Sequence, residues 1–581
     1  MYVVLASDPA GVRITPLDDS GAPVAAAGRT IAREHLPAEV AALERERPRW
    51  VWDDTSRWYP QLLAAGVRVE RCVDLRLCHV ILRNSALTAG SELATAQRGP
   101  WDAAAVDEKP ALLGTLFDLE AFGAEGSESS EGTEGPERTK GNGTNSTDAP
   151  RNQADPVAEF LAQRAAVAAS AGSGRLNLLL AAESAGALVA SEMRLAGLPW
   201  NVARHDELLA ELLGARPKPG ERPAILEAVL QRVRDLLEAP ELNPDSPNDL
   251  LRALRRAGLV IDSTRSWELK KLTHPAIEPL LEYKKLARLM AANGWNWVDT
   301  WIENGRFRPD YVPGGVVTGR WATSGGGALQ LPRQVRGAVM SDPGWEFVVA
   351  DAAQLEPRVL AGLAGDAKMA EAGRGDLYEG IVASGAVATR AEAKVAMLGA
   401  MYGATSGDGG RLMPRLAKAF PAAIAMVEAA ARAGERGEVV TTRLGRSSPP
   451  PGESWRDIQG EAYGTDASAA DQKRAISQSR GWGRFTRNFI VQGTAAEWAL
   501  CWMAGLRNRL WELGTGPLTE RPHLVFFLHD EVIVHTPKAL ADQVAAEVRA
   551  AAADAGRLIF GSMPVDFPVT TAIVESYADA K

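Results

Sequence analysis

Cysteine is scarce in this sequence of 581 residues, which contains only Cys72, Cys78 and Cys501. The three form neither a CxxC pair nor an even set, so a small disulfide-stapled fold and a cysteine-rich zinc ribbon are excluded. Long apolar runs are missing too, because nowhere do about 18 apolar residues follow one another without a charge. The N-terminus also lacks the basic segment and apolar core of a signal peptide. We therefore expect a cytoplasmic protein with no membrane among its partners.

An excess of positive charge is also missing. The 64 lysines and arginines face 73 acidic residues and leave a net charge of −9, which argues against a protein that coats nucleic acid with its whole surface. Part of the acidity lies in residues 123–156, which contain no aromatic or large aliphatic side chain. Such a segment cannot offset the entropy of ordering by burial, so we expect a disordered acidic linker there.

The linker separates a small unit from a large one. In residues 1–122, YVVLAS and VRITPL joined by DPAG predict a β-hairpin, and WVWDD and VRVERCVDL predict further strands among Ala- and Leu-rich helical stretches. This is an α/β pattern. Residues 157–300 predict helices with a turn at NPDSPND, and strands return at WEFVVA and HLVFFLHDEVIVHT on either side of a second helical block.

Acidic residues stand at the ends of two strand-like runs. Asp351 follows WEFVVA, and Asp530 lies with His529 and Glu531 in the bend of a predicted hairpin. Two simpler interpretations stay open, since Asp351 and Gln354 fit a helix-capping box and the acidic bend fits a polar turn. A buried hairpin with an acidic bend, however, needs compensation. If Asp351 and Asp530 face one another, they could hold two Mg²⁺ ions about 3.5–4 Å apart for phosphoryl transfer.

Basic residues form two further patterns. The helical segment RAEAKVAMLGAMYG carries one stripe at a spacing of four, made of Arg390, Lys394, Leu398 and Tyr402. Its two cations near the helix N-terminus could attract a polyphosphate, and the alternative is a solvated face beside a core tyrosine. In DQKRAISQSRGWGRFTRNF, basic and aromatic side chains are interleaved, as on a surface that follows a nucleic-acid backbone.

Taken in order, these blocks resemble the motifs of family A DNA polymerases, the DNA polymerase I type. DAAQLEPR resembles motif A, RAEAKVAMLGAMYG resembles motif B and HDE resembles motif C. TGRWATSGGGALQLPR resembles the segment that grips the primer-template, and RNFIVQGTAAE resembles the helix at the template minor groove. NPDSPNDLLRAL and LLEYKKLARLM resemble the thumb. The resemblance covers most of residues 157–581.

The resemblance implies an α+β fold. It combines an N-terminal α/β exonuclease-like domain of the RNase H-like type with a right-hand polymerase of palm, fingers and thumb around an antiparallel palm sheet. The implied divisions are the exonuclease-like domain (1–122), the linker (123–156), a mostly helical thumb region (157–310), a first palm segment with motif A (311–365), the fingers with motif B (366–494) and a second palm segment with motif C (495–581).

Roles carry over to the matching positions. Asp351 and Asp530 become ligands of two catalytic Mg²⁺ ions, for which Mn²⁺ could substitute, with Glu531 beside them. The implied contacts to the incoming nucleotide are Arg390, Lys394, Leu398, Tyr402, Glu356 and Gln354, of which the two cations would hold the triphosphate. The implied contacts to primer, template or minor groove are Arg320, Gln330, Arg484, Asn488, Gln492 and His529.

Some positions depart from the family's usual residues, and one distinguishes DNA polymerases from related RNA polymerases. Members usually carry Phe or Tyr at the position of Leu398, and Ala352 and Ala353 replace a tyrosine and a serine of motif A. Glu356 would fill the space beneath the sugar and block a 2′-hydroxyl. The related single-subunit phage RNA polymerases leave room for ribose there.

The N-terminal unit stands where the family places a 3′–5′ proofreading exonuclease, but the chemistry of that enzyme is missing. The activity needs an Asp-x-Glu triplet on the first strand and further aspartates to bind two metals. The first strand here has no such triplet, Trp58 stands where a second aspartate is expected, and Asp74 alone aligns. We therefore expect an inactive exonuclease-like domain, and no 5′-nuclease domain before it.

These predictions together describe a template-directed DNA-dependent DNA polymerase. It would be a nucleotidyltransferase that adds dNTPs to a primer 3′-hydroxyl, without proofreading, in DNA replication or repair. Its implied partners are primer-template DNA and dNTPs, and we expect a monomer associated with the nucleoid. Two alternatives stay open: an enzyme like the single-subunit RNA polymerases, and a non-catalytic protein that binds primer-template.

Overall fold

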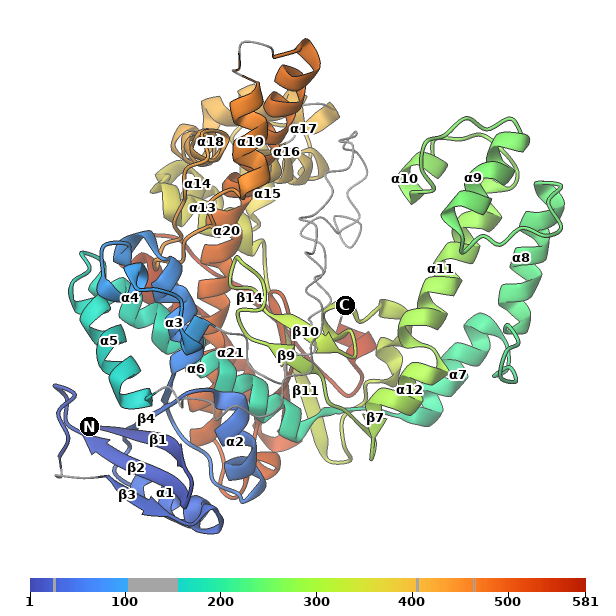
Figure 1. Ribbon diagram of the computed structural model, residues 1–581. Helices are drawn as coiled ribbons and strands as arrows, with labels where there is room; N and C mark the ends of the chain where they lie inside the picture. Colours follow the sequence, from blue (N-terminus) through green and yellow to red (C-terminus); the bar gives the residue numbers. More distant parts are fainter. Residues whose placement is uncertain (25–27, 103–154, 404–406, 463, 465–466, 581) are drawn as a thin grey trace.

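The computed structural model describes residues 1–24, 28–102, 155–403, 407–462, 464 and 467–580. The predicted disordered linker at 123–156 lies outside the described residues, except for Asp155 and Pro156 at the start of a helix. The last part of the predicted N-terminal domain, 103–122, also lies outside them. Within the described chain, helices and four small sheets combine in an α+β fold, as predicted (Figure 1).

The N-terminal unit is a mixed sheet with helices. Its elements are β1 (Tyr2–Asp8), β2 (Gly11–Leu17), β3 (Arg29–Ile31), β4 (Arg49–Trp52), β5 (Cys72–Asp74), α1 (Leu36–Glu44), α2 (Thr55–Ala64), α3 (Leu75–Asn84) and α4 (Glu92–Thr95). The strand order is β3-β2-β1-β4-β5. The predicted hairpin is confirmed, because β1 and β2 pair antiparallel around the turn between Asp8 and Gly11. β4 and β5 continue the sheet in parallel.

The two helices after the linker, α5 (Pro156–Ala168) and α6 (Ser173–Ala196), pack against this unit. α5 contacts α3 and β1, and α6 contacts α2, β5 and the long helix α20 (Ala469–Glu512). These contacts tie the two helices to the N-terminal unit, although we expected residues 157–310 to form one thumb region. Among the described helices, only α6 is long and apolar enough to cross a membrane, and 67% of its most apolar stretch is buried, as in a core helix.

An arm of helices follows. It contains α7 (Val202–Leu213), α8 (Ala224–Leu236), α9 (Pro247–Arg256), α10 (Ser266–Leu269), α11 (Ile277–Asn293) and α12 (Trp295–Trp301). The predicted turn at NPDSPND is confirmed, because the Ser246 side chain caps α9 by accepting the Asp249 N–H. Leucines of α8, α9 and α11 form a core of the arm's own.

Short strands join the arm to the central sheet. β6 (Leu198–Pro199), β7 (Ile302–Glu303) and β8 (Arg306–Phe307) form one small sheet, and β9 (Asp310–Val312) pairs with β10 (Ala322–Gly325). The central sheet contains β11 (Trp345–Ala352), β12 (His523–Leu528), β13 (Glu531–Pro537) and β14 (Val569–Val574). Its order is β12-β13-β11-β14 and all its pairs are antiparallel, as predicted.

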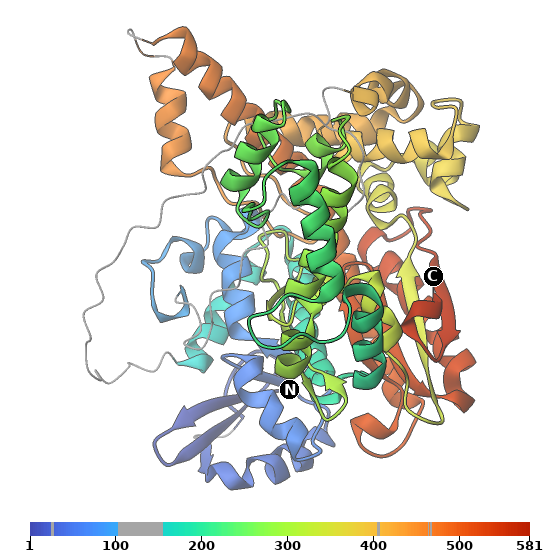
Figure 2. The same ribbon diagram turned by 90° about the vertical axis from the view of Figure 1, so that its right-hand side faces the viewer.

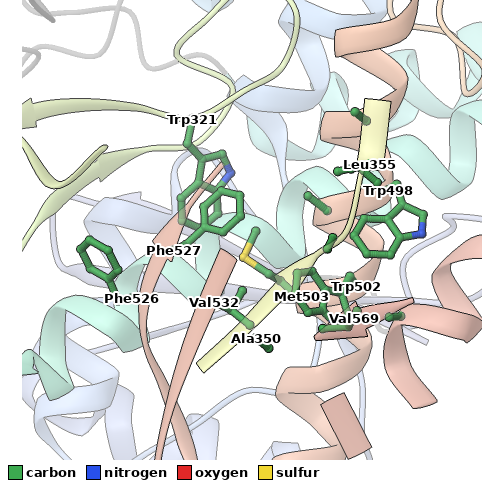
Figure 3. Close-up of a cluster of buried hydrophobic side chains, with 14 of the residues drawn as sticks. Trp321, Ala350, Leu355, Trp498, Trp502, Met503, Phe526, Phe527, Val532 and Val569 are labelled. Atoms are coloured by element: carbon green, nitrogen blue, oxygen red, sulfur yellow. The ribbon is translucent and has the colours of Figure 1, made fainter. Parts of the chain in front are cut away.

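Two helices cover the central sheet, α20 and α21 (Ala541–Phe560). Figure 3 shows the buried side chains of this layer, in which Trp498, Trp502 and Met503 of α20 lie beside Ala350 and other residues of the sheet. β11, β12 and β13 are buried along most of their length, which explains their nearly continuous apolar runs, because strands buried on both faces cannot alternate with polar residues.

A second helical block lies between β11 and β12 in the chain. It contains α13 (Leu355–Ala364), α14 (Ala367–Ala372), α15 (Leu377–Ala383), α16 (Arg390–Tyr402), α17 (Gly407–Ala419), α18 (Pro421–Glu435) and α19 (Glu453–Glu461). In Figure 1 the block stands to the upper left of the central sheet, the arm to its right and the N-terminal unit to its lower left. Figure 2 turns the arm toward the viewer.

Candidate active site

Asp351 and Asp530 are brought together at one end of the central sheet. Asp351 in β11 lies opposite Glu531 in β13, and the Ala352 N–H donates a 2.9 Å hydrogen bond to the Asp530 carbonyl. Both aspartates are half-buried. The capping-box interpretation is wrong: the strand continues through Asp351 to Ala352, and α13 starts after Gln354 with no side-chain cap.

The chemistry of this pair suits a hard divalent cation. Such ions prefer carboxylate oxygens, and Mg²⁺ commonly keeps water and substrate oxygens in its coordination shell. Within the residues that the structure describes, no three His, Cys, Asp or Glu side chains converge as a complete ligand set. Two carboxylates suit an ion whose remaining ligands are water or substrate oxygens.

The hairpin that carries Asp530 is anchored by a distant residue. The Tyr311 hydroxyl accepts a 3.0 Å hydrogen bond from the Phe527 N–H and donates a 2.6 Å bond to the Phe527 carbonyl. Trp321 packs edge-on against the Phe527 ring, with 5.1 Å between ring centroids (Figure 3). His529 turns the chain in a left-handed conformation with φ of 59°. Nothing in the sequence near Tyr311 signals this role.

Glu531 has a different environment from that of Asp530. It is 2% exposed and accepts a hydrogen bond from the Tyr577 hydroxyl near the C-terminus. Burial and the charge of Glu531 raise the pKa of Tyr577. The Arg336 guanidinium lies 4.4 Å from the Tyr577 ring centroid. Glu531 thus links the hairpin to the C-terminal segment through Tyr577, and sequence reasoning missed both Tyr577 and Arg336.

Glu356 joins three segments of the site. Its carboxylate, in the first turn of α13, forms an ion pair with Arg320 and accepts a 3.0 Å hydrogen bond from the Tyr402 hydroxyl at the end of α16. Burial, together with the charge of Glu356, raises the pKa of Tyr402. The tyrosine therefore stays neutral at physiological pH and keeps its proton for this bond.

His529 lies near the same arginine. Burial lowers the pKa of His529 to about 4, and the positive charge of Arg320 adds to the effect. The imidazole is therefore neutral at physiological pH. A neutral imidazole offers one donor and one acceptor, so it can take part in a hydrogen bond to a substrate without adding charge.

The predicted basic stripe lies on α16, with Thr389 as its cap. Lys394 is exposed, and Leu398 is half-buried against the core. Arg390 donates two hydrogen bonds, of 2.8 Å and 3.2 Å, to Asp376. The sequence did not predict Asp376 as a partner of Arg390, because Asp376 lies fourteen residues before Arg390 and outside the helical stripe.

Gln354 is engaged within the protein. Its Nε2 donates a 2.9 Å hydrogen bond to Asp376, and its Oε1 accepts bonds from Arg358 at 3.0 Å and from the Leu377 N–H at 3.2 Å. A contact between Gln354 and a nucleotide, which the resemblance implies, stays a prediction.

Besides Arg320 and His529, four residues predicted to contact nucleic acid lie on two elements beside the sheet. Arg484, Asn488 and Gln492 recur every four residues along α20 and are half-buried. Gln330 is exposed in the turn that follows β10. One basic residue of the interleaved segment behaves differently, because Arg487 is 6% exposed and pairs with Glu428 of α18.

Asp74 of the N-terminal unit serves as a helix cap. It is 2% exposed and accepts hydrogen bonds from the Thr55 N–H at 2.7 Å and the Leu77 N–H at 3.1 Å. Burial raises its pKa to about 7, with a smaller contribution from the Asp54 charge. Trp58 is buried. The structure thus gives the one aligned aspartate a local structural task.

Comparison with known proteins finds similarity to DNA polymerases. The model of DNA polymerase family A matches residues 223–579. The thermostable DNA polymerase I of Thermus thermophilus is 27% identical over 316 residues, which cover 48% of this chain and 34% of that protein. The thermostable DNA polymerase I of Thermus aquaticus is 26% identical over 400 residues, which cover 63% of this chain and 40% of that protein. The chain thus spans well under half the length of these relatives.

Among solved structures, the POL domain of Pol1 from M. smegmatis, in complex with DNA primer-template and dNTP, has a TM-score of 0.66. The match covers 100% of this chain and 95% of that chain at 17% sequence identity. At this identity the likeness concerns the fold alone.

Proposed function

The chain belongs to DNA polymerase family A, and from this membership we propose that it is a template-directed DNA-dependent DNA polymerase that extends a primer 3′-hydroxyl with dNTPs. The observation that carries the proposal is the meeting of Asp351 and Asp530 at the end of an antiparallel sheet. The M. smegmatis relative binds DNA primer-template and dNTP, which we propose as the partners of this chain too.

The proposed roles follow from position and charge. Asp351 and Asp530 would hold two Mg²⁺ ions, which when bound favour loss of the 3′-hydroxyl proton and stabilise the leaving oxygen. Arg390 and Lys394 would bind the triphosphate and neutralise the charge that develops on pyrophosphate. Glu356, held by Tyr402, would occupy the space beneath the sugar. The central sheet would then be the palm, the second helical block the fingers and the arm the thumb.

Extension of a 5′-labelled primer on a longer template tests the proposal. The wild type should extend the primer with Mg²⁺ and dNTPs and stop when the metal is chelated. Asp351→Ala and Asp530→Ala should each abolish extension and leave primer-template binding nearly intact, because neither removes a basic contact. Glu346→Gln is the matched control, since this acidic residue lies at the other end of β11. It should extend like the wild type.

The same assay separates the alternatives. Extension that persists in Asp351→Ala or Asp530→Ala would overturn the metal assignment. Tight binding of primer-template without any extension would favour the non-catalytic protein, and a preference for ribonucleotides would favour an enzyme like the single-subunit RNA polymerases.

We further propose that the N-terminal unit does not shorten DNA. Asp74, the one aligned carboxylate, is buried and used as a helix cap. A primer incubated with Mg²⁺ and no dNTPs should therefore keep its length, and shortening would contradict this part of the proposal. We also propose that the chain is a monomer and that it associates with the nucleoid in the cytoplasm. Sedimentation tests the oligomeric state, and imaging of a fluorescent fusion tests the localisation.

A further inference from the structure

A buried arginine behind the candidate active site has all its donors in use. Arg358 of α13 is 1% exposed. Its guanidinium donates to one side chain, that of Gln354, at 3.0 Å. It also donates to four backbone carbonyls, those of Ala353 at 2.8 Å, Asp566 at 3.1 Å, Gly375 at 2.6 Å and Gly373. Arg358 thus fixes residues 373–375 against the start of α13.

The loop that Arg358 holds continues into Asp376, whose two oxygens have separate partners. Oδ1 accepts the Glu379 N–H at 3.0 Å and caps α15. Oδ2 accepts Gln354 Nε2 at 2.9 Å and the Nε and Nη2 groups of Arg390 at 3.2 Å and 2.8 Å. A continuous chain of hydrogen bonds therefore runs from Arg358 through Gln354 and Asp376 to Arg390. It connects the end of β11 with the first turn of α16.

Asp376 engages one edge of the Arg390 guanidinium. The Tyr378 ring lies against its face, with 5.4 Å from the guanidinium carbon to the ring centroid. Over the part of the chain that the structure describes, Nη1 of Arg390 makes no hydrogen bond, and the side chain is 49% exposed. The guanidinium is thus held on one edge and against one face, while the side chain as a whole stays half exposed.

We propose that Asp376, held by Arg358 and Gln354, positions Arg390 to receive the triphosphate of the incoming nucleotide. The inference rests on the proposed function and deepens it, because it makes Asp376 and Gln354 positioning residues behind a basic ligand. An exposed arginine loses rotamer freedom when it binds an anion. An arginine whose guanidinium is already fixed by two hydrogen bonds loses less. The fixed guanidinium therefore binds phosphate oxygens more tightly than a mobile one.

The negative charge of Asp376 opposes the binding of a triphosphate, whereas its hydrogen bonds to Arg390 favour it. A second residue, Glu379, allows the two effects to be measured separately. Charge alone would repel a triphosphate, so its removal would strengthen binding. Glu379 lies on the same helix, with its carboxylate 3.9 Å from Arg390 Nε and its side chain 61% exposed. Glu379→Gln therefore removes the same charge from the same neighbourhood without breaking the two-bond contact to Asp376.

Calorimetric titration of the full chain with inorganic tripolyphosphate tests the positioning without any need for extension. Asp376→Asn keeps the size of the side chain and a good helix cap. It should weaken binding about fivefold to tenfold, because the ion pair between Arg390 and a carboxylate becomes a weaker hydrogen bond to an uncharged amide. Glu379→Gln should bind as the wild type does or slightly more tightly. In the Arg390→Ala background, Asp376→Asn should cause no further loss, because the two residues act through one contact.

Three results would overturn the proposal: unchanged or tighter binding by Asp376→Asn, an equal loss in the Arg390→Ala background, or no binding of tripolyphosphate by the wild type. Primer extension then distinguishes this proposal from the proposed function. If the wild type extends, Asp376→Asn should raise KM for dNTP by the same factor and leave kcat nearly unchanged. If the wild type binds tripolyphosphate but does not extend, the proposed function fails and the titration still decides the role of Asp376.

Discussion

At the residue scale, Glu356 is held from two sides, by Arg320 and by Tyr402. Glu356→Ala should raise the use of rNTPs relative to dNTPs by roughly tenfold or more, because it opens the space beneath the sugar. Competitive single-nucleotide extension measures the ratio. Tyr402→Phe is the matched control: it removes the hydrogen bond but leaves the Glu356 side chain in place, so extension should slow while discrimination persists. An unchanged ratio in Glu356→Ala would remove the steric argument.

Asp74 gives a prediction for pH at the same scale. Burial raises its folded-state pKa to about 7 from an ordinary value of 3.8, so the folded chain binds this proton more tightly than the unfolded chain. Its contribution to stability is therefore present at pH 4 and is lost as the pH rises through 7. The side chain of the Asp74→Asn variant cannot ionise, so the variant does not lose this stability. The unfolding free energy of the variant minus that of the wild type should therefore rise by roughly 1–3 kcal/mol between pH 4 and pH 8.

Denaturant unfolding of both proteins across this range checks the prediction for Asp74. A difference between the two proteins that does not change with pH would mean that the carboxyl group ionises with little cost. It would also restore Asp74 as a candidate metal ligand.

At the element scale, the sequence predicts those elements whose determinants are local. The apolar runs placed β11 and the β12–β13 hairpin, and the turn predicted at NPDSPND lies at the start of α9. Gly403 ends α16 by a local rule of the same kind, since its φ is 77° and a side chain there would be strained. What the sequence did not predict depends on partners far along the chain. Tyr311 binds a backbone 216 residues away, and Tyr577 binds Glu531 across 46 residues.

The candidate site divides in the same way. Asp351 and Asp530 could be placed from the ends of two strand-like runs, whereas Glu356 was implied only by the family resemblance. The pairing of Asp376 with Arg390 could not, because it depends on how the loop before α15 folds back onto α16. The capping-box interpretation of Asp351 failed for a related reason: sheet pairing with β13 and β14 carried the strand past the position where a local rule ends it.

Tyr311 allows a test of the element that carries Asp530. Tyr311→Phe leaves the ring in place but removes the hydroxyl that serves both the N–H and the carbonyl of Phe527. Two buried backbone groups lose a partner, so the protein should be destabilised by about 1–3 kcal/mol. Primer extension should also slow, because the bend at Asp530 loses its anchor. If stability falls while extension at low temperature keeps its full rate, Tyr311 supports the fold but does not position the bend.

At the scale of the whole molecule, the N-terminal unit is fastened to α20 through a buried charged cluster. Arg507 of α20 donates to both oxygens of Glu192 in α6, at 2.8 Å and 2.6 Å, and Tyr59 of α2 donates to the same carboxylate at 2.6 Å. Arg507 also donates to the Glu70 carbonyl at 2.7 Å. α20 also carries Arg484, Asn488 and Gln492, three of the residues predicted to contact DNA, so we expect the N-terminal unit to stabilise this helix.

Glu192 is the residue of this cluster whose loss is best interpreted. Although burial alone would raise it, the charges of Arg507 and Arg68 hold the pKa of Glu192 below its usual range. Glu192→Ala leaves these two cations without compensation, so it should destabilise the protein by about 3–5 kcal/mol and lower the unfolding temperature by several degrees. Glu547→Ala removes a half-buried partner of Arg509, which lies two residues further along α20 and keeps Asp554 as a second partner, and should cost less than about 1 kcal/mol. Equal effects of the two variants in calorimetry would mean that the buried cluster does not fasten the N-terminal unit. A larger loss in Glu192→Ala, with the N-terminal unit and α20 unfolding in one transition, would show that the unit is part of the polymerase scaffold.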